Sequence, residues 1–419
     1  MVQKSVLENG IRVITEKIPA AHSVTIGFWV ENGSRHETSA ESGISHFLEH
    51  MLFKGTESRN AVDIAKEIDS VGGVLNGFTS REYSCYYAKV LARKLPLAID
   101  LISDIVLNSV FELDEIEKER RVILQEIYML EDTPDDYVHD LFSQTFWQKH
   151  PLGRPILGSR DSVGEISREG LFELLRRRYC GKNILICAAG DLEHQEIADR
   201  IGEAFRDVLP GTKSEDFAPV EYQRRVNILE KDLEQVHLCL GTRALPQSHP
   251  NRFESYLLNT ILGGSMSSRL FQKIREELGL AYSIYSYLSS HSDAGSLVLY
   301  SGTSPDSAPR VAALMLKEFS RLKKEPVSQE ELSSAREQVK GNLLLSMEST
   351  DNRMTRLAKN EIYMGRQLNL KEVLRGLDQV GCEQLRQLAE FILQDEYLNL
   401  EMIGKIRKSD FPLLDLTIG

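Results

Sequence analysis

The sequence predicts an α+β protein made of two similar halves, each a mainly antiparallel sheet packed with helices. The same order of strands and helices occurs twice along the 419 residues, which are enough for two domains with separate cores. The segment FELDEIEKERRVILQEI (111–127) matches VSQEELSSAREQVKGNL (327–343) in helical periodicity and in its acidic start. A charged, irregular stretch separates the halves. The expected bounds are an N-terminal domain at 1–212, a linker at 213–225 and a C-terminal domain at 226–419.

Each element follows from the spacing of apolar residues. The N-terminus is expected to form two short strands around a turn at Asn9 and Gly10. The further elements of the first half are a strand at 24–31, helices at 42–54 and 61–71, strands at 74–78 and 83–90, and helices at 95–108 and 114–129. Those of the second half are a strand at 235–242, helices at 253–262 and 267–277, strands at 281–288 and 295–301, and helices at 309–323 and 328–347. Accidental similarity is the alternative, but agreement in both order and length favours a duplication.

The composition, 42% hydrophobic and 27% charged, is typical of a globular protein. No apolar run approaches the roughly 18 residues that span a bilayer, and the start lacks the apolar region of a signal peptide. The five cysteines are scattered and show no C-x-x-C spacing, which is typical of reduced thiols. A net charge of −12 argues against a general nucleic-acid binder. We therefore expect a cytoplasmic protein without membrane or nucleic-acid partners.

The segment GISHFLEHMLFKG (43–55) places His46, Glu49 and His50 in an otherwise apolar helix. Positions i and i+4 share one helix face, so the two imidazoles can bind one zinc ion. Glu49 lies beside that face and can reach a metal-bound water as general base. The pattern H-x-x-E-H inverts the common H-E-x-x-H order. The alternative is a pair of core histidines that donate to backbone carbonyls.

The helix expected at 114–129 offers a third ligand. Glu119 and Glu126 are two turns apart on one of its faces. Glu126 lies in the apolar stretch VILQEIYML, where an unpaired carboxylate is poorly placed, so we expect it to bind the metal. Glu119 would then hold a histidine ring or the water. A solvated helix face is the alternative for these acidic residues.

The second half lacks every equivalent of these side chains. An alignment of the halves sets Glu119 and Glu126 against Ala335 and Asn342, and sets His46, Glu49 and His50 against Tyr256, Asn259 and Thr260. One metal site per chain follows.

The motif HFLEHMLFKGT followed by EIEKERRVILQEI resembles the inverzincin peptidases, which include pitrilysin, insulin-degrading enzyme and the mitochondrial processing peptidase. The resemblance runs along essentially the whole chain and is closest to the short bacterial processing-peptidase-like branch. It implies one Zn²⁺ per chain on His46, His50 and Glu126, with Glu49 as base and Glu119 as supporting residue. It also implies that two paired α+β chains, each half of a clamshell, close around a chamber.

Two further segments resemble functional parts of this family. IREELGLAY places Arg275 and Tyr282 like the arginine–tyrosine pair that stabilises the developing oxyanion, which implies action in trans within a homodimer. The alternative is that Arg275 caps its helix near Gly279 and Tyr282 is an ordinary strand aromatic. GGVLNGFTSREYSCYYAKV resembles the substrate-binding edge strand and supplies the three candidate substrate-binding residues, Asn76, Gly77 and Phe78. The family usually has alanine where this chain has Gly77.

The expected function is that of a zinc metalloendopeptidase, a hydrolase that cleaves peptides or unfolded segments within a closed dimer chamber. Two alternatives remain, a non-catalytic scaffold subunit and a processing subunit that needs a different partner chain. Loss of ligands would mark a scaffold, and all five zinc-site residues are present. The presence of Arg275 and Tyr282 argues against a need for a second kind of chain.

Overall fold

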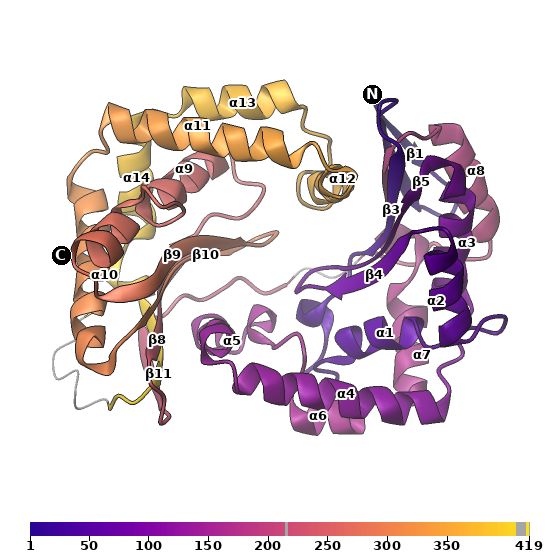
Figure 1. Ribbon diagram of the computed structural model, residues 1–419, viewed down its shortest axis with the longest axis horizontal. Coiled ribbons are helices and arrows are strands. Elements are labelled where there is room, and N and C mark those ends of the chain that lie inside the picture. The colour runs from indigo at the N-terminus through magenta and orange to yellow at the C-terminus, as the bar shows by residue number, and fades with distance from the viewer. Residues whose placement is uncertain (214–216, 408–415, 419) are drawn as a thin grey trace. The chain divides into compact units, whose positions relative to one another are not determined.

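The computed structural model describes residues 1–213, 217–407 and 416–418 and divides into two compact units, each built around its own sheet (Figure 1). Because the mutual placement of the units is not determined, each is described by itself. Unit 1 comprises Met1–Met129, Arg154–Phe217 and Ser346–Gln367, and unit 2 comprises Leu130–Gly153, Ala218–Leu345 and Leu368–Gly419.

The sheet of unit 1 has six strands, and its central strands are buried because both faces are covered. β3 and β6 are almost entirely buried, and β4 lies at the edge of the sheet. All neighbouring pairs are antiparallel except β2 and β6, which are parallel. In spatial order the strands are β1 (Val2–Val6), β2 (Arg12–Lys17), β6 (Ile184–Gly190), β3 (Ser23–Val30), β5 (Ser84–Leu91) and β4 (Val74–Thr79).

Helix α1 joins the core of unit 1 through the apolar side chains that surround its histidines. Phe47, Leu48, Met51 and Leu52 are buried in that core, so the position of α1 is fixed by packing. The helices of unit 1 before the C-terminal half are α1 (Ile44–Leu52), α2 (Ala61–Ser70), α3 (Leu95–Leu107), α4 (Leu113–Glu131), α6 (Arg160–Glu165), α7 (Arg168–Arg178) and α8 (His194–Ala204).

Unit 2 repeats this topology, and its strand order β7-β11-β8-β10-β9 corresponds to β2-β6-β3-β5-β4, including the single parallel pair. The predicted duplication is therefore confirmed. The strands are β7 (Arg225–Glu230), β11 (Asn399–Gly404), β8 (Val236–Ala244), β10 (Gly295–Thr303) and β9 (Ala281–Ser290). The helices are α9 (Arg252–Leu262), a π-helical segment (Phe271–Glu277), α10 (Ala308–Lys324), α11 (Gln329–Ser346), α13 (Leu370–Gln379) and α14 (Cys382–Ile392).

Two helices are exchanged between the units: one from the N-terminal half of the sequence belongs to unit 2, and one from the C-terminal half belongs to unit 1. Helix α5 (Pro134–Trp147) packs on β11 and β8 of unit 2, and α12 (Thr350–Met364) packs on β6 and β3 of unit 1. The continuous domains expected at 1–212 and 226–419 do not include this exchange. Its physical reason is that each helix supplies the apolar cover for the second face of a sheet. The expected linker includes residues 214–216, which lie outside the described residues.

The predicted elements agree with the observed ones to within a few residues. The N-terminal strands pair as expected, but their turn is longer than two residues, because the N–H of Leu7 donates to the carbonyl of Ile11 at 2.9 Å. Gly10 takes the left-handed conformation in this turn, with φ of 90°. No helix within the described residues is long and apolar enough to cross a membrane.

Candidate metal centre

A buried carboxylate fixes the start of α1. Glu37 accepts hydrogen bonds from the N–H groups of Gly43 at 2.8 Å and Ser45 at 2.9 Å, donors that the first turn of a helix leaves without partners. Burial raises the pKa of Glu37 to about 7, although the hydrogen bonds from Ser45 and Gly43 oppose this rise. The helix that carries the histidines is thus capped by a nearly inaccessible carboxyl group.

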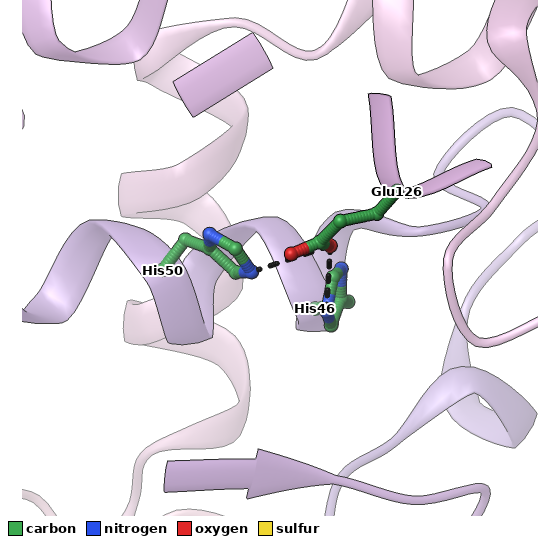
Figure 2. A group of neighbouring side chains, drawn as sticks. All are labelled: His46, His50 and Glu126. Atoms are coloured by element: carbon green, nitrogen blue, oxygen red, sulfur yellow. Dashed lines mark ion pairs between the residues drawn. The ribbon is translucent and has the colours of Figure 1, made fainter. Parts of the chain in front are cut away.

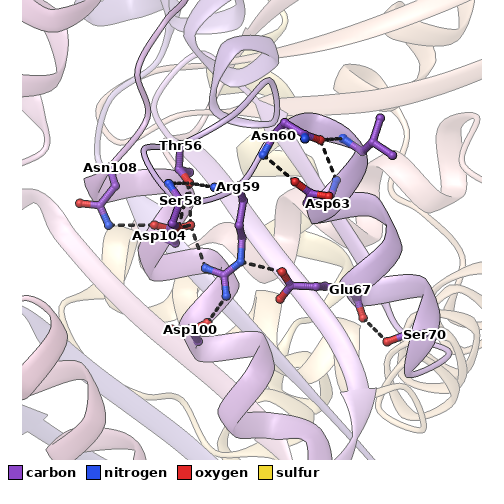
Figure 3. A network of polar contacts seen from close by, with 11 residues as sticks. Thr56, Ser58, Arg59, Asn60, Asp63, Glu67, Ser70, Asp100, Asp104 and Asn108 are labelled. Atoms are coloured by element: carbon purple, nitrogen blue, oxygen red, sulfur yellow. Dashed lines mark hydrogen bonds and ion pairs between the residues drawn. The ribbon is translucent and has the colours of Figure 1, made fainter.

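The segment after α1 is held by a polar network around Arg59 (Figure 3). The Arg59 guanidinium donates to Glu67 of α2 at 2.9 Å and to Asp104 of α3 at 2.8 Å. It also donates to Asp100 at 2.6 Å, and the Thr56 hydroxyl donates to Asp104 at 2.8 Å. The network ties the connection between α1 and α2 to α3, so both ends of α1 are fixed.

His46 and His50 of α1 converge with Glu126 of α4 (Figure 2). The Nε2 atoms of His46 and His50 lie 3.7 and 3.6 Å from Oε2 of Glu126. A tetrahedral ion with bonds of about 2.1 Å separates its ligand atoms by roughly 3.4 Å, so these atoms suit zinc. In the part of the chain that the structure describes, this is the one group of at least three metal-binding side chains whose ligand atoms all lie within 4.8 Å of one another.

Burial keeps His46 in the neutral form that a metal ligand must have. Burial lowers the pKa of His46 to about 3, and the charge of His50 adds to this effect. His46 is therefore neutral at pH 7, as a metal ligand must be. Nδ1 of His46 and Oε2 of Glu49 are buried and have no hydrogen-bond partner among the described residues. Such atoms are costly, and a bound ion with its water would satisfy the Glu49 oxygen.

Glu49 lies between the histidine pair and the edge strand β4. Burial raises the pKa of its carboxyl group, while the Thr79 hydroxyl and His50 oppose the rise. A Cβ at Gly77 would lie 3.2 Å from Cγ of Glu49, which is tighter than most packing contacts. A glycine at this position therefore gives the Glu49 side chain room against β4.

Glu119 holds the ring of His50. Oε2 of Glu119 lies 2.9 Å from Nδ1 of His50, so Nε2 is the atom that faces Glu126. The second oxygen of Glu119 pairs with Lys54 at 2.7 Å. The sequence analysis expected Glu119 to hold a histidine ring or the water, and its contact with His50 agrees with the first of these, while its role at a metal site stays a prediction. Lys54 was not expected to take part, because it lies beyond the end of α1 and its partner Glu119 belongs to α4, which only the fold brings close.

The reason given for choosing Glu126 as a ligand is wrong. Its side chain is 36% exposed, and its neighbours Tyr128 and Met129 are 42% and 67% exposed. The apolar letters around Glu126 do not mark a buried face, because α4 buries mainly its isoleucines. The buried carboxylate of this helix is Glu119, and Glu126 is distinguished by its proximity to both histidines.

The candidate substrate strand is the edge strand β4, as predicted. Asn76 is exposed, and its side-chain oxygen accepts from the N–H of Gly77 at 2.8 Å. The ring of Phe78 packs edge-on against Trp29, with centroids 5.5 Å apart. Phe78 is thus part of an aromatic cluster on one face of the sheet, whereas Gly77 faces Glu49 on the other.

In unit 2, Arg275 and Tyr282 lie side by side. The guanidinium carbon is 5.0 Å from the centre of the Tyr282 ring, and the tyrosine is 79% exposed. Tyr282 is the extra residue of a β-bulge, because the register passes from Gly302 opposite Ser283 to Thr303 opposite Ala281. The catalytic role of Tyr282 stays a prediction, because a bulge and an exposed ring do not by themselves assign one.

Comparisons with known proteins agree with the two halves. The family described as insulinase (peptidase family M16) matches residues 12–160, and the peptidase M16 inactive domain matches residues 165–339. An uncharacterized zinc protease of Bacillus subtilis is 40% identical over 95% of this chain and 97% of its own. One from Mycobacterium tuberculosis is 38% identical over 94% and 91%.

Two solved structures share the fold at low sequence identity. A peptidase M16 inactive domain from Pseudomonas fluorescens has a TM-score of 0.90 at 19% identity, covering 96% of this chain and 98% of its own. A protease from Helicobacter pylori has a TM-score of 0.87 at 20% identity, covering 96% and 99%.

Proposed function

Because the chain belongs to peptidase family M16, we propose that it is a zinc-dependent endopeptidase that cleaves peptides or unfolded segments of polypeptide. The observation that carries the proposal is the convergence of His46, His50 and Glu126 within 4.8 Å, with the half-buried Glu49 carboxylate beside them. Neither feature has an equivalent among the described residues of unit 2, where α9 carries Tyr256, Asn259 and Thr260. Unit 2 therefore repeats the topology of unit 1 without its candidate metal ligands.

The three ligands would hold one zinc ion through two imidazole nitrogens and a carboxylate oxygen. When bound, zinc supplies a Lewis acid that acidifies water and polarises a carbonyl group. The Glu49 carboxylate would accept a proton from the attacking water and pass it to the nitrogen of the leaving amine. Its raised pKa brings it closer to the pH at which one group can serve as base and then as acid.

Two other groups of residues complete the proposal. A peptide would add to the free edge of β4 through main-chain hydrogen bonds, next to Gly77 and Glu49. Arg275 and Tyr282 would donate to the developing oxyanion, because a cation and a phenol suit the charge that forms there. We propose that they do so in trans, in a homodimer that encloses its substrate.

Zinc content and hydrolysis of a quenched peptide library, measured for the wild type and Glu49→Gln, test this function. We expect about one zinc per chain in both proteins and a loss of about 10²–10⁴ in rate for the variant. A wild type that holds zinc but cleaves nothing would support a scaffold subunit or one that needs another partner. The mass of the protein purified alone then separates a homodimer from a subunit that lacks its partner.

A further inference from the structure

The carboxylate of Glu119 joins a histidine and a lysine in one chain of polar contacts. One of its oxygens is 2.9 Å from Nδ1 of His50, and the other is 2.7 Å from Nζ of Lys54. The Glu119 side chain is only 7% exposed, while those of His50 and Lys54 are 18% and 30% exposed. All three residues belong to unit 1.

A nearly buried carboxylate is unfavourable unless a cation or hydrogen-bond donors compensate for its lost hydration. Lys54 supplies the cation. It lies two residues after the end of α1 and four residues after His50. The helix that carries His50 is thus followed directly by Lys54, which stabilises the Glu119 carboxylate that holds the His50 ring. The 2.9 Å contact allows Nδ1 of His50 to donate to Glu119, which would leave the lone pair of Nε2 free for a metal ion.

We propose that Lys54 is a positioning residue of the zinc site, which acts through Glu119 to hold His50 in the orientation and tautomer that bind the metal. This inference rests on the proposed function. The inference also makes the two histidines unequal, because Nδ1 of His46 finds no hydrogen-bond partner in the part of the chain that the structure describes. His50 would be the ligand anchored through its Nδ1, whereas the polar contact of His46 is the one between its Nε2 and Glu126.

The sign of the effect separates this role from simple electrostatics. A lysine near a dication repels it, so removal of the charge alone would strengthen zinc binding. Loss of the anchor would weaken binding instead. Residues that orient a metal ligand typically change affinity by about 10- to 100-fold when they are mutated.

The experiment measures the zinc dissociation constant by competition with a chelator, together with the melting temperature of the zinc-free protein. The variants are Lys54→Met, Lys54→Arg, Glu119→Gln and the double variant Lys54→Met/Glu119→Gln. The matched control is Lys118→Met, which removes the same charge from a residue that is 57% exposed and pairs with Glu115.

We expect Lys54→Met to weaken zinc binding about tenfold or more, Lys54→Arg to restore most of the affinity, and the control to leave it unchanged. The double variant should bind zinc no more weakly than Glu119→Gln, because Lys54 acts only through Glu119. Unchanged or tighter binding by Lys54→Met overturns the inference, as does a lower melting temperature without weaker binding. If the wild type itself binds no zinc, the proposed function fails as well.

Discussion

Replacement of Glu37 by glutamine should change how stability depends on pH. The folded-state pKa of Glu37 is raised from 4.5 to about 7, chiefly by burial, and one pKa unit corresponds to about 1.4 kcal/mol. The protonated form is therefore the one that the fold favours. Its stabilising contribution is complete below about pH 4.5 and is lost as the pH rises through about 7, a change of about 3 kcal/mol.

The assay is urea unfolding of zinc-free wild type and Glu37→Gln at several values between pH 5 and pH 8. Glutamine cannot ionise, so the difference in free energy of unfolding isolates Glu37 while other titrating groups cancel. The amide also faces two N–H donors with one acceptor atom, which adds a cost that does not depend on pH. The wild type should lose about 2.5 kcal/mol relative to the variant across this range. If the difference in free energy of unfolding between the two proteins stays constant within about 1 kcal/mol from pH 5 to pH 8, the pKa of Glu37 is not raised as described.

Three further substitutions test the neighbouring parts of the site. Glu126→Gln should lower zinc affinity by at least about tenfold without unfolding unit 1, since Glu126 is partly exposed; equal affinity by chelator competition would exclude it as a ligand. Gly77→Val should displace Glu49, because the added Cβ would lie 3.2 Å from Cγ of Glu49. Peptide hydrolysis should then fall by about tenfold or more while the zinc content stays the same. Full activity would show that β4 moves to accommodate the new side chain without displacing Glu49. Arg59→Leu should lower the free energy of unfolding by about 1–3 kcal/mol in urea titrations, because Asp104 loses its cation. The control is the exposed Arg93→Leu, which should change the free energy of unfolding by less than about 0.5 kcal/mol.

The sequence predicted the parts of the site that depend on local periodicity. His46 and His50 share a helix face because of their spacing, and the apolar residues between them oblige α1 to pack in a core. Glu126 was chosen partly for a wrong reason, because a run of apolar letters on a long helix does not reveal which of them face solvent. Its proximity to the histidines is a tertiary property that the family resemblance supplied.

Other features could not be predicted because they arise from packing between distant segments. The apolar faces of α5 and α12 indicate that each helix is covered, but a helical pattern carries no information about which sheet covers it. A glycine suits position 77 because the Glu49 side chain lies beside it, and only the fold brings Glu49 close to β4. The partners of Glu37 at the start of α1 were not predicted either, since the carboxylate lies six residues before the first N–H that it accepts.

The most direct test of the zinc site is anomalous diffraction at the zinc absorption edge from crystals of the protein. We predict one peak per chain, about 2.0–2.2 Å from Nε2 of His46, Nε2 of His50 and a carboxylate oxygen of Glu126. A peak elsewhere, or none at these residues in zinc-supplemented crystals, would contradict it.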